Sequence, residues 1–473
     1  MLGGINLKAI ILAAGEGKRM KSNLPKVLHS IAGKPMLHCV IDACIKADIE
    51  DITVIVGNAG EEVQKATPYP VNFVWQNRQL GTGHAVLCAK EHISPDDTVV
   101  VLFADCPLIT PEFLKTLSDF RDKEQANGVV VATRIPNPSG YGRVFTTQKK
   151  YEKNEKYNGK NDEFESIFES IIEERDLSPD QVSNNLINTG VYLSTGREIL
   201  YGLERISDNN SQKEYYLTDV PQIIKEANFK VSVYYESDFT QFLGVNSQRQ
   251  LAEANTVMRN RILDKHFESG VVITDPLSTY IDIDVEIEAG AVLLPGTMLH
   301  GNCKIGKEAI IGPYTQMTDS VIGTRTAVRH SVLEEAVIGD DCQVGPYTYL
   351  RKGTVVGDRC RIGDFVEIKN SSFGNDSKAS HLAYIGDAKI GDNVNFGCGS
   401  ITVNYDGKSK YFTVVEDEAF IGSNVNLIAP VTVQKGAFVA AGSTIVNDVP
   451  ADALAIARQR QTNKEGRAKE CMK

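Results

Sequence analysis

The chain has 473 residues, of which 42% are hydrophobic, and it carries a net charge of −11. This length predicts two or three domains, each with enough apolar side chains for a core. The acidic balance argues against general attraction to nucleic acid or anionic lipid, so any phosphate site must be built from local basic groups.

The nine cysteines are scattered, without a CxxC pair or a Cys/His cluster. This distribution argues against a structural zinc site or a disulfide framework and is typical of reduced thiols in a cytosol. The apolar run from Ala9 to Ala14 is too short to cross a membrane and lacks the layout of a signal peptide. We therefore expect a cytoplasmic protein that binds neither nucleic acid nor membrane.

Residues 7–246 alternate between short apolar runs and helical segments such as Met36–Ala47. The alternation predicts buried parallel strands with crossover helices, an α/β layered domain over residues 1–246. Ligands of such sheets bind at the carboxyl ends of the strands, so the residues after each strand are the candidates. The expected strands are Leu7–Leu12, Ile52–Val56, Val71–Trp75, Val99–Phe103, Val129–Thr133 and Leu186–Tyr192.

The segment after the first strand contains groups that suit an anion. Gly15 and Gly17 let backbone N–H groups approach a phosphate, and Arg19 and Lys26 can neutralise it. The segment is neither a Walker loop nor a GxGxxG dinucleotide loop, and a lone GxG does not by itself establish a phosphate site.

Asp105 follows the fourth strand and has two interpretations. It is either a Mg²⁺ ligand at the carboxyl end of the strand or the N-cap of the next helical segment. Asn246, after the strand region Val231–Tyr235, is a candidate second oxygen ligand.

From Ile287 to Ile445 the chain repeats with a period of six residues, often with glycine after the aliphatic one. This period fits a short strand plus a tight corner and predicts a parallel β-helix over residues 268–473, after a helical linker at residues 247–267. At about 4.8 Å per coil, roughly eight coils give a prism about 38 Å long. The expected inward residues are Ile287, Leu293, Leu299, Ile305 and Ile311, then Val332, Ile338, Val344, Leu350, Val356, Ile362 and Ile368, then Ile421, Leu427, Val433, Val439 and Ile445.

The count of six slips in three places, which lie between Ile311 and Val332, between Ile368 and Ile390, and across a polar stretch that delays Ile421. Each slip is either a tolerated corner or a projecting loop that carries binding residues. The later two hold acid–base and anion-binding side chains, which favours a site there. These side chains are Lys378, His381 and Tyr384 in the second slip and Asn404, Tyr405 and Lys410 in the third.

Short motifs along the chain carry a resemblance to a known family. They are LAAGEGKRM (12–20), LPKVL (24–28), QLGTGHA (79–85), GYGR (140–143), INTG (187–190), EYYLTD (214–219), VEIK (366–369), SHL (380–382) and NYDG (404–407). The first six resemble the sugar-1-phosphate nucleotidylyltransferases. With the hexapeptide repeats, the chain resembles the bacterial bifunctional N-acetylglucosamine-1-phosphate uridylyltransferase/glucosamine-1-phosphate N-acetyltransferase family over almost its whole length.

The resemblance implies a Rossmann-like nucleotidylyltransferase domain followed by a left-handed parallel β-helix of hexapeptide repeats. It implies acetylation of glucosamine-1-phosphate by acetyl-CoA, and then transfer of uridylyl from UTP to N-acetylglucosamine-1-phosphate with release of pyrophosphate. It also implies dependence on Mg²⁺, assembly into a homotrimer, and a product that supplies peptidoglycan and lipopolysaccharide precursors.

For the first domain, the resemblance implies roles for specific residues. The uridine nucleotide is expected on Leu12, Ala13, Ala14, Gly15, Gln76, Gly81 and Thr82. The N-acetylglucosamine moiety is expected on Phe103, Ala104, Asp105, Gly140, Glu173 and Asn188. Mg²⁺ is expected on Asp105 and Asn246, while Arg19 and Lys26 offset the charge of the phosphates.

For the β-helix, the resemblance implies His381 as the general base, since a histidine can accept a proton near neutral pH. Glucosamine-1-phosphate is expected on Arg351, Lys369, Tyr384 and Asn395. Acetyl-CoA is expected on Cys398, Asn404, Tyr405, Ser423, Ala441 and Arg458. The chain departs from the usual pattern at Ala104, at Cys398, at Gln459-Arg460 and in a charged insertion from Lys149 to Glu165.

Two other functions compete with this interpretation. The β-helix of a nucleotidylyltransferase for another sugar can serve only in regulation or oligomerisation, and a scaffold subunit can retain a decayed transferase domain. The candidate phosphate and base residues of the β-helix argue against the first, because a scaffold needs none of them. The candidate phosphate and Mg²⁺ residues of the first domain argue against the second.

Overall fold

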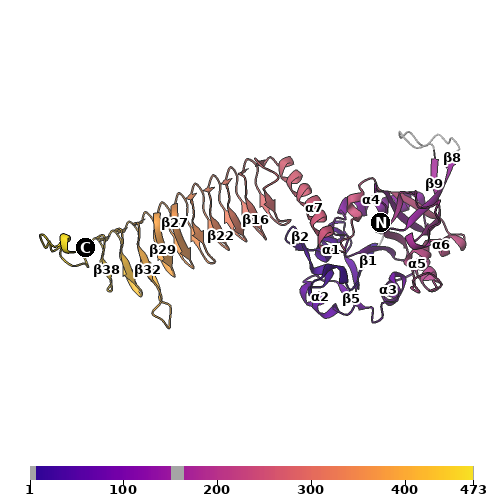
Figure 1. Cartoon of the computed structure of the whole chain (residues 1–473), viewed down its shortest axis with the longest axis horizontal. Helices are drawn as coiled ribbons and strands as arrows, with labels where there is room; N and C mark the ends of the chain where they lie inside the picture. Colours follow the sequence, from indigo (N-terminus) through magenta and orange to yellow (C-terminus); the bar gives the residue numbers. More distant parts are fainter. Residues whose placement is uncertain (1–6, 151–163, 472–473) are drawn as a thin grey trace, which may run out of the picture. The chain divides into compact units, whose positions relative to one another are not determined.

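The computed structural model describes residues 7–150 and 164–471, and the chain divides into two compact units, Met1–Met258 and Arg259–Lys473 (Figure 1). The long helix α7 (Gln248–Glu268) contains the point at which they divide. Among the described residues, no helix combines the length and the apolar character that a bilayer-spanning helix requires.

The first unit is built on one nine-stranded sheet. Its edge half, β5-β4-β1-β6, is parallel, whereas β10 runs antiparallel to both β6 and β7. The expectation that this sixth strand is parallel is wrong, because a buried strand has the same apolar composition in either direction. In spatial order the strands are β5 (Asn72–Trp75), β4 (Asp51–Val56), β1 (Leu7–Ala13), β6 (Thr98–Phe103), β10 (Leu186–Thr195), β7 (Gly128–Arg134), β11 (Val231–Tyr235), β9 (Phe164–Ile172) and β8 (Arg143–Lys150).

Helices cover both faces of this sheet, as an α/β layered domain requires. Alternate residues of β1 point to opposite sides, so that Ile11 packs in one core and Ile10 in the other. The first core includes α1 (Met36–Lys46) and α4 (Pro111–Glu124). The second includes α3 (Thr82–Cys88), α5 (Gly196–Leu203) and α6 (Val220–Glu226). The first unit also contains α2 (Gly60–Ala66) and the small hairpin of β2 (Ser30–Ile31) and β3 (Lys34–Pro35).

Strands β8 and β9 form an antiparallel pair that extends to Lys150 and Phe164. Most of the charged insertion expected from Lys149 to Glu165 belongs to residues 151–163, which lie outside the described residues.

The second unit is a parallel β-helix, in which strands stack one above the next as the chain winds (Figure 1). One face carries nine stacked strands, from β14 (Glu286–Ile287) to β36 (Val431–Val433). The other strands run from β12 (Val272–Ile273) to β39 (Leu454–Ala455), and the short helix α8 (Ala468–Cys471) follows. Candidate residues lie on or just after β25 (Tyr349–Leu350), β27 (Arg361–Lys369), β29 (Lys378–Gly386), β31 (Asn395–Phe396), β34 (Phe420–Ile421) and β37 (Phe438–Val439).

The expected inward residues are buried, with one exception. Each is at most 9% exposed apart from Val332, which is 37% exposed, while its neighbour Leu333 is fully buried. The inward positions here are Val328, Leu333 and Ile338, which are separated by steps of five residues rather than six. Counting back six from Ile338 therefore selects the wrong one of two adjacent aliphatic residues.

The second slip in the count is also a change of step length rather than a projecting loop. Lys378, His381 and Tyr384 lie on β29, a nine-residue strand that pairs in parallel with β27 over its length. The expectation of a loop is wrong here, because Phe373 occupies an inward position five residues after Ile368 and the coil continues. The third slip does leave the coil, through a loop closed by a bridge between Tyr405 and Lys410.

Candidate functional site

A cavity of about 310 Å³ lies at the carboxyl ends of β1 and β6 in the first unit. This is the edge at which parallel sheets bind their ligands. Ten of the expected residues lie together in its wall, which are Leu12, Ala13, Ala14, Gly15, Lys26, Gln76, Gly81, Thr82, Phe103 and Asp105. The remaining lining residues are Val27, Gln79, Ala85 and Glu214.

Lys26, Asp105 and Asn246 form a compact cluster at this cavity. Nζ of Lys26 donates to Oδ2 of Asp105 at 2.5 Å and to Oδ1 of Asn246 at 2.9 Å. The side chains of Lys26 and Asp105 are only 9% and 17% exposed, so water screens their attraction weakly. The N–H of Val245 donates to the carbonyl of Asp105 at 2.9 Å, which brings the next residue, Asn246, to the carboxylate.

The N-cap interpretation of Asp105 is wrong. Helix α4 begins at Pro111, and its N-cap is Thr110, whose hydroxyl accepts from the N–H of Phe113 at 3.2 Å. A carboxylate and an amide oxygen instead converge on one ammonium group, and these are ligand types that suit Mg²⁺. Within the described residues there is no group of three or more His, Cys, Asp or Glu side chains placed for a metal, so a Mg²⁺ ion here would take its other ligands from phosphates and water.

Hydrogen bonds fix the orientation of the Gln76 side-chain amide at the cavity. Its Nε2 donates to the carbonyl of Gly81 at 3.0 Å and lies 3.1 Å from Nδ1 of His84, whose pKa is lowered by burial. Because a carbonyl can only accept, the amide nitrogen must face Gly81, and the amide oxygen remains for a ligand. Gly81 has a φ of +113°, and a Cβ there would lie 2.5 Å from the carbonyl oxygen of Tyr215. Only glycine fits this close approach.

Several expected residues of this domain are not part of the cavity wall. Ala104 is fully buried and donates its N–H to the carbonyl of Leu12 at 3.0 Å. Arg19 is exposed on the short 3₁₀ helix Lys18–Met20. Gly140 is exposed, and its N–H donates to Oε1 of Glu174 at 2.8 Å.

Glu173 and Asn188 also lie outside the wall. Burial raises the pKa of Glu173, the negative charges of Asp176 and Asp219 raise it further, and a hydrogen bond from Thr218 opposes them. Asn188 is buried, and its amide donates to the hydroxyl of Tyr192 at 2.7 Å. Gln79 and Glu214, by contrast, line the cavity although no role was expected for them. The signal for both was present, because they begin the motifs QLGTGHA and EYYLTD.

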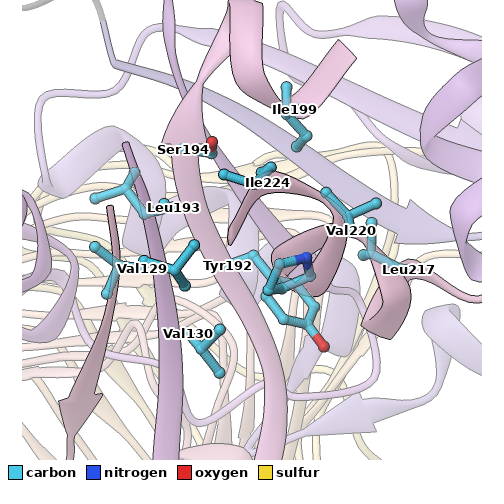
Figure 2. A pocket seen from close by; sticks show the side chains of 12 residues that line it. Val129, Val130, Tyr192, Leu193, Ser194, Ile199, Leu217, Val220 and Ile224 are labelled. Atoms are coloured by element: carbon cyan, nitrogen blue, oxygen red, sulfur yellow. The ribbon is translucent and has the colours of Figure 1, made fainter. Parts of the chain in front are cut away.

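A second cavity of the first unit, of about 20 Å³, is an apolar gap in the core (Figure 2). Figure 2 shows Val129, Leu193, Val220 and Ile224 around it, with the ring of Tyr192 at one side. A space this small holds about one water molecule and offers it no polar partners, so it is a packing gap rather than a binding site.

In the second unit, Arg351 and Lys369 lie on consecutive coils, one above the other. β25 pairs in parallel with β27 so that Leu350 lies opposite Ile368. Arg351 and Lys369, which follow them, are therefore opposite each other as well. Nη1 of Arg351 donates to Oε1 of Glu367 at 2.9 Å, which holds the guanidinium in place. Two stacked cations of this kind suit a phosphate group.

Lys410, from the loop of the third slip, reaches the same cluster. Close approach of the Lys369 side chain and repulsion between the two positive charges lower the pKa of Lys410, and the charge of Asp387 opposes this effect. The hydroxyl of Tyr384 lies against Gly386, which is in register with Lys369. The structure therefore brings three cationic side chains and a phenol to one place on the surface of the β-helix.

His381 lies on β29 in register with Asp364 on β27. Its Nδ1 is 2.6 Å from Oδ1 of Asp364, and the two side chains are 58% and 38% exposed. The hydrogen bond with His381 lowers the pKa of Asp364, and the charge of Arg361 also lowers it. Asp364 and Glu367 had no expected role, because their partners are one coil away and the sequence does not reveal the length of that coil.

Four residues expected at acetyl-CoA form a column along the β-helix. The pairings of β31, β34, β37 and β39 place Cys398, Ser423 and Ala441 on successive coils, and all three are exposed. Nη1 of Arg458 donates to the carbonyl of Ala441 at 2.6 Å and extends the column by one coil. His381 lies one coil before Cys398, since β29 pairs with β31 and β32 at a constant offset.

The other expected acetyl-CoA residues belong to the loop. Asn404 is buried and donates its amide to Oδ2 of Asp387 at 2.6 Å, so its side chain anchors the loop. Tyr405 is 56% exposed, and its hydroxyl donates to the carbonyl of Gly407 at 2.7 Å. Asn395, expected at the amino sugar, lies on β31 in register with Lys378. No hydrogen bond within the described residues joins Asn395 to the cationic cluster.

Three family models match parts of the chain. They are a MobA-like NTP transferase domain over residues 9–165, the C-terminal domain of GMPPB over residues 277–372, and the hexapeptide repeat of succinyl-transferase over residues 413–446. These matches confirm the predicted order of a nucleotidyltransferase domain and a hexapeptide-repeat domain, and the repeat is consistent with the left-handed form of the β-helix.

Curated relatives match the chain over nearly its whole length. Bifunctional protein GlmU of Alkaliphilus metalliredigens is 46% identical over 462 residues, which cover 98% of each chain. The protein of the same name from Clostridioides difficile is 44% identical and covers 98% of this chain and 97% of its own. That of a Geobacillus species is 45% identical and covers 97% and 96% respectively.

Proposed function

The chain belongs to the family of bifunctional GlmU proteins, and from this membership we propose that it catalyses two steps in the synthesis of UDP-N-acetylglucosamine. The second unit acetylates glucosamine-1-phosphate with acetyl-CoA, and the first unit transfers uridylyl from UTP to the acetylated sugar phosphate. One observation on the β-helix carries this proposal. A cationic cluster suited to a phosphate occurs together with a histidine, and this histidine lies one coil from a column of exposed small residues.

The geometry of the second unit supports the proposed acetyl transfer. Arg351, Lys369 and Lys410 bind the sugar phosphate, and Tyr384 borders it. His381 accepts a proton from the amine as the nitrogen forms its bond to the acetyl carbon. The C–S bond of the thioester then breaks, and the imidazolium returns the proton to the departing thiolate of CoA.

The column of exposed residues supports an extended co-substrate. Cys398, Ser423 and Ala441 present small side chains on successive coils, and Arg458 adds a positive charge at the far end. Four steps of about 4.8 Å, from the coil of His381 to that of Arg458, span roughly 19 Å, which is a suitable length for the pantetheine arm of acetyl-CoA with its phosphates near the arginine. The thioester then lies at the His381 end.

The uridylyl transfer takes place in the cavity of the first unit. An oxygen of N-acetylglucosamine-1-phosphate attacks the α-phosphorus of UTP, and the bond to pyrophosphate breaks. The nucleophile is already an anion, so the protein has to position two polyanions and offset their repulsion. Lys26 supplies one fixed positive charge, and the free amide oxygen of Gln76 accepts a hydrogen bond from an N–H of the base.

Mg²⁺ is part of this proposal. Asp105 and Asn246 would hold it, because their oxygens already converge on one cationic group. When bound, the ion neutralises charge on the reacting phosphates.

We also propose a homotrimer in the cytoplasm. A ladder of Tyr314, His330, Tyr347 and Phe365 runs along one corner of the β-helix, with ring centroids 5.5–5.8 Å apart, and all of these rings except the half-buried His330 are exposed. Leu382, which is 58% exposed, continues this ladder beside His381. An apolar stripe next to an exposed candidate base supports packing against another copy, which would shield the acetyl site from water. All nine cysteines are free, as expected in a reducing compartment.

The test is to assay the purified chain for acetyl-CoA-dependent acetylation of glucosamine-1-phosphate and for Mg²⁺-dependent formation of UDP-N-acetylglucosamine, with sedimentation to measure assembly. Uridylyl transfer without acetylation would support the alternative in which the β-helix only regulates or oligomerises. Loss of both reactions in folded protein would support the scaffold alternative. An acetylating monomer would overturn the trimer alone.

A further inference from the structure

The hydrogen bond between His381 and Asp364 is set by the backbone of the β-helix. The two residues are 17 positions apart in the chain and lie directly opposite each other in the parallel pairing of β27 and β29. Neighbouring pairs on the same two strands, such as Val366 with Ala383, have the same offset. The 2.6 Å contact is therefore a property of a regular ladder rather than of a mobile loop.

The pairing defines which ring nitrogen carries the proton. The hydrogen bond with His381 favours the ionised form of Asp364, and an ionised carboxylate can only accept a hydrogen bond. Nδ1 of His381 must therefore be the donor, so a neutral ring has its lone pair on Nε2. Among the described residues, Nε2 has no hydrogen-bond partner in the protein, and His381 is exposed.

Within the part of the chain that the structure describes, the remaining surroundings of His381 offer no competing hydrogen-bond partner. On β27, Arg361 lies near the carboxylate of Asp364 and favours its ionised form. On the next coil, Cys398 lies opposite His381 through the constant offset of β29 with β31 and β32. A histidine whose Nδ1 proton is held by a carboxylate, with Nε2 directed away from it, has the arrangement that a general base requires.

We propose that Asp364 is a positioning residue for acetyl transfer, whose carboxylate holds the Nδ1 proton of His381 and thereby presents the Nε2 lone pair to the amine of the sugar. This inference rests on the proposed acetylation of glucosamine-1-phosphate. In that step the amine forms its bond to the acetyl carbon and loses a proton to Nε2, the C–S bond breaks, and the CoA thiolate takes the proton from the imidazolium. Asp364 remains ionised throughout and stabilises the imidazolium.

The test is Asp364→Asn, which keeps the shape of the side chain and removes its charge. We expect kcat for acetylation to fall about 10- to 100-fold, less than for a buried dyad, because solvent screens this exposed pair. KM for glucosamine-1-phosphate should stay within about twofold, since the phosphate cluster is intact. The rising limb of the pH profile should move to lower pH, because the imidazolium loses its anionic partner. Uridylyl transfer by the same preparation should equal wild type and reports correct folding.

A matched control is Asp376→Asn, which removes an aspartate of similar exposure, 39%, that pairs with Arg359 at 2.8 Å. It should leave acetylation and its pH profile unchanged. Asp364→Glu should recover part of the lost rate and restore the wild-type position of the pH limb. If Asp364→Asn acetylates with wild-type kcat and an unshifted profile, the inference is overturned and the proposed function stands. If wild-type protein does not acetylate at all, both are overturned together.

Discussion

The two units build their candidate sites in opposite ways. In the first, Lys26 and Asp105 meet inside a cavity, and their side chains are 9% and 17% exposed. In the second, Arg351 pairs with Glu367 and His381 with Asp364 on an open face, and these side chains are 37% to 58% exposed. The cavity shields its charged side chains from water, whereas the open face does not. Burial by assembly with other copies would therefore strengthen the charge interactions of the second site more than those of the first.

The largest expected effect tests whether acetyl transfer takes place on the open face of the β-helix, independently of the cavity. His381→Ala should lower the turnover of acetyl transfer about 10²- to 10⁴-fold, because it removes the general base. Uridylyl transfer should be unchanged. Steady-state assays of both reactions on one preparation measure this, with binding of glucosamine-1-phosphate followed by calorimetry and expected to survive.

The control for this variant is His300→Ala, which removes a histidine of the same β-helix that lies 3.4 Å from Asp282. It should acetylate at the wild-type rate. Wild-type acetylation by His381→Ala across pH 6 to 9 would make His381 a packing residue and place the base elsewhere.

The next effect tests the cavity. Asp105→Ala should lower Mg²⁺-dependent release of pyrophosphate about 10²- to 10³-fold, because one of the two proposed Mg²⁺ ligands is lost where the phosphates react. The variant also leaves Lys26 without its carboxylate partner in a shielded position. Acetyl transfer should remain within about twofold of wild type, since the two sites belong to separate units.

A coupled phosphate-release assay measures this, and Asp48→Ala, at an exposed ion pair with Lys115, is the control. An equal loss of both activities in folded Asp105→Ala protein would contradict two independent sites.

The contrast between the units also explains which features of the sites can be predicted from the sequence. Ten cavity residues could be predicted because each lies at the end of a strand, directly after one, or in a recognisable motif. The resemblance implied that Asp105 and Asn246 meet at Mg²⁺. Their direct contact with Lys26 could not be predicted, since it depends on folding that brings together residues up to 220 positions apart. The direction of β10 could not be predicted either, because a buried strand is apolar whether it runs parallel or antiparallel to its neighbours.

In the β-helix, the period of six residues predicted the fold, but steps of five residues led to a wrong inward position. Val332 and Leu333 are both aliphatic, so composition cannot say which one faces inward. The same uncertainty in step length hides the partner of His381, because Asp364 is opposite it only in a coil of 17 residues. The loop from Asn404 was predictable, since its polar stretch interrupts the aliphatic repeat altogether.

A smaller effect separates substrate binding from chemistry on the open face. Lys369→Ala should raise KM for glucosamine-1-phosphate about 10-fold with little change in kcat, because it removes one of several cations that pair with the phosphate. Lys352→Ala, which removes an exposed lysine paired with Glu335, should leave KM unchanged. Initial-rate kinetics with both substrates varied measure the two constants. A fall in kcat at constant KM would instead assign Lys369 to the chemical step.

The smallest effect concerns the anchor of the loop that carries Lys410. Asp387 is buried and accepts from the amides of Asn370 and Asn404 at 2.6 Å each. Burial raises the pKa of Asp387, but the two hydrogen bonds and the charge of Lys369 outweigh it, so the pKa lies below its usual value. A lowered carboxyl pKa stabilises the folded state above the ordinary aspartate pKa, and this contribution is lost as the pH falls through the lowered value.

Asp387→Asn should therefore loosen the loop at pH 7 and matter less as the medium becomes acidic. A hydrogen bond to a charged group contributes about 1.5–3 kcal/mol, which corresponds to a roughly 10- to 100-fold loss of amide protection. The amide of Tyr411, which donates to the carbonyl of Asn404 at 2.8 Å, reports this directly in hydrogen exchange. Asp448→Asn, on an exposed turn next to Thr432, is the control. Because the loop holds Lys410 against Lys369, the same variant should raise KM for the sugar phosphate at pH 7. Unchanged protection at Tyr411 would mean that the backbone of the coil, and not the buried carboxylate, holds the loop in place.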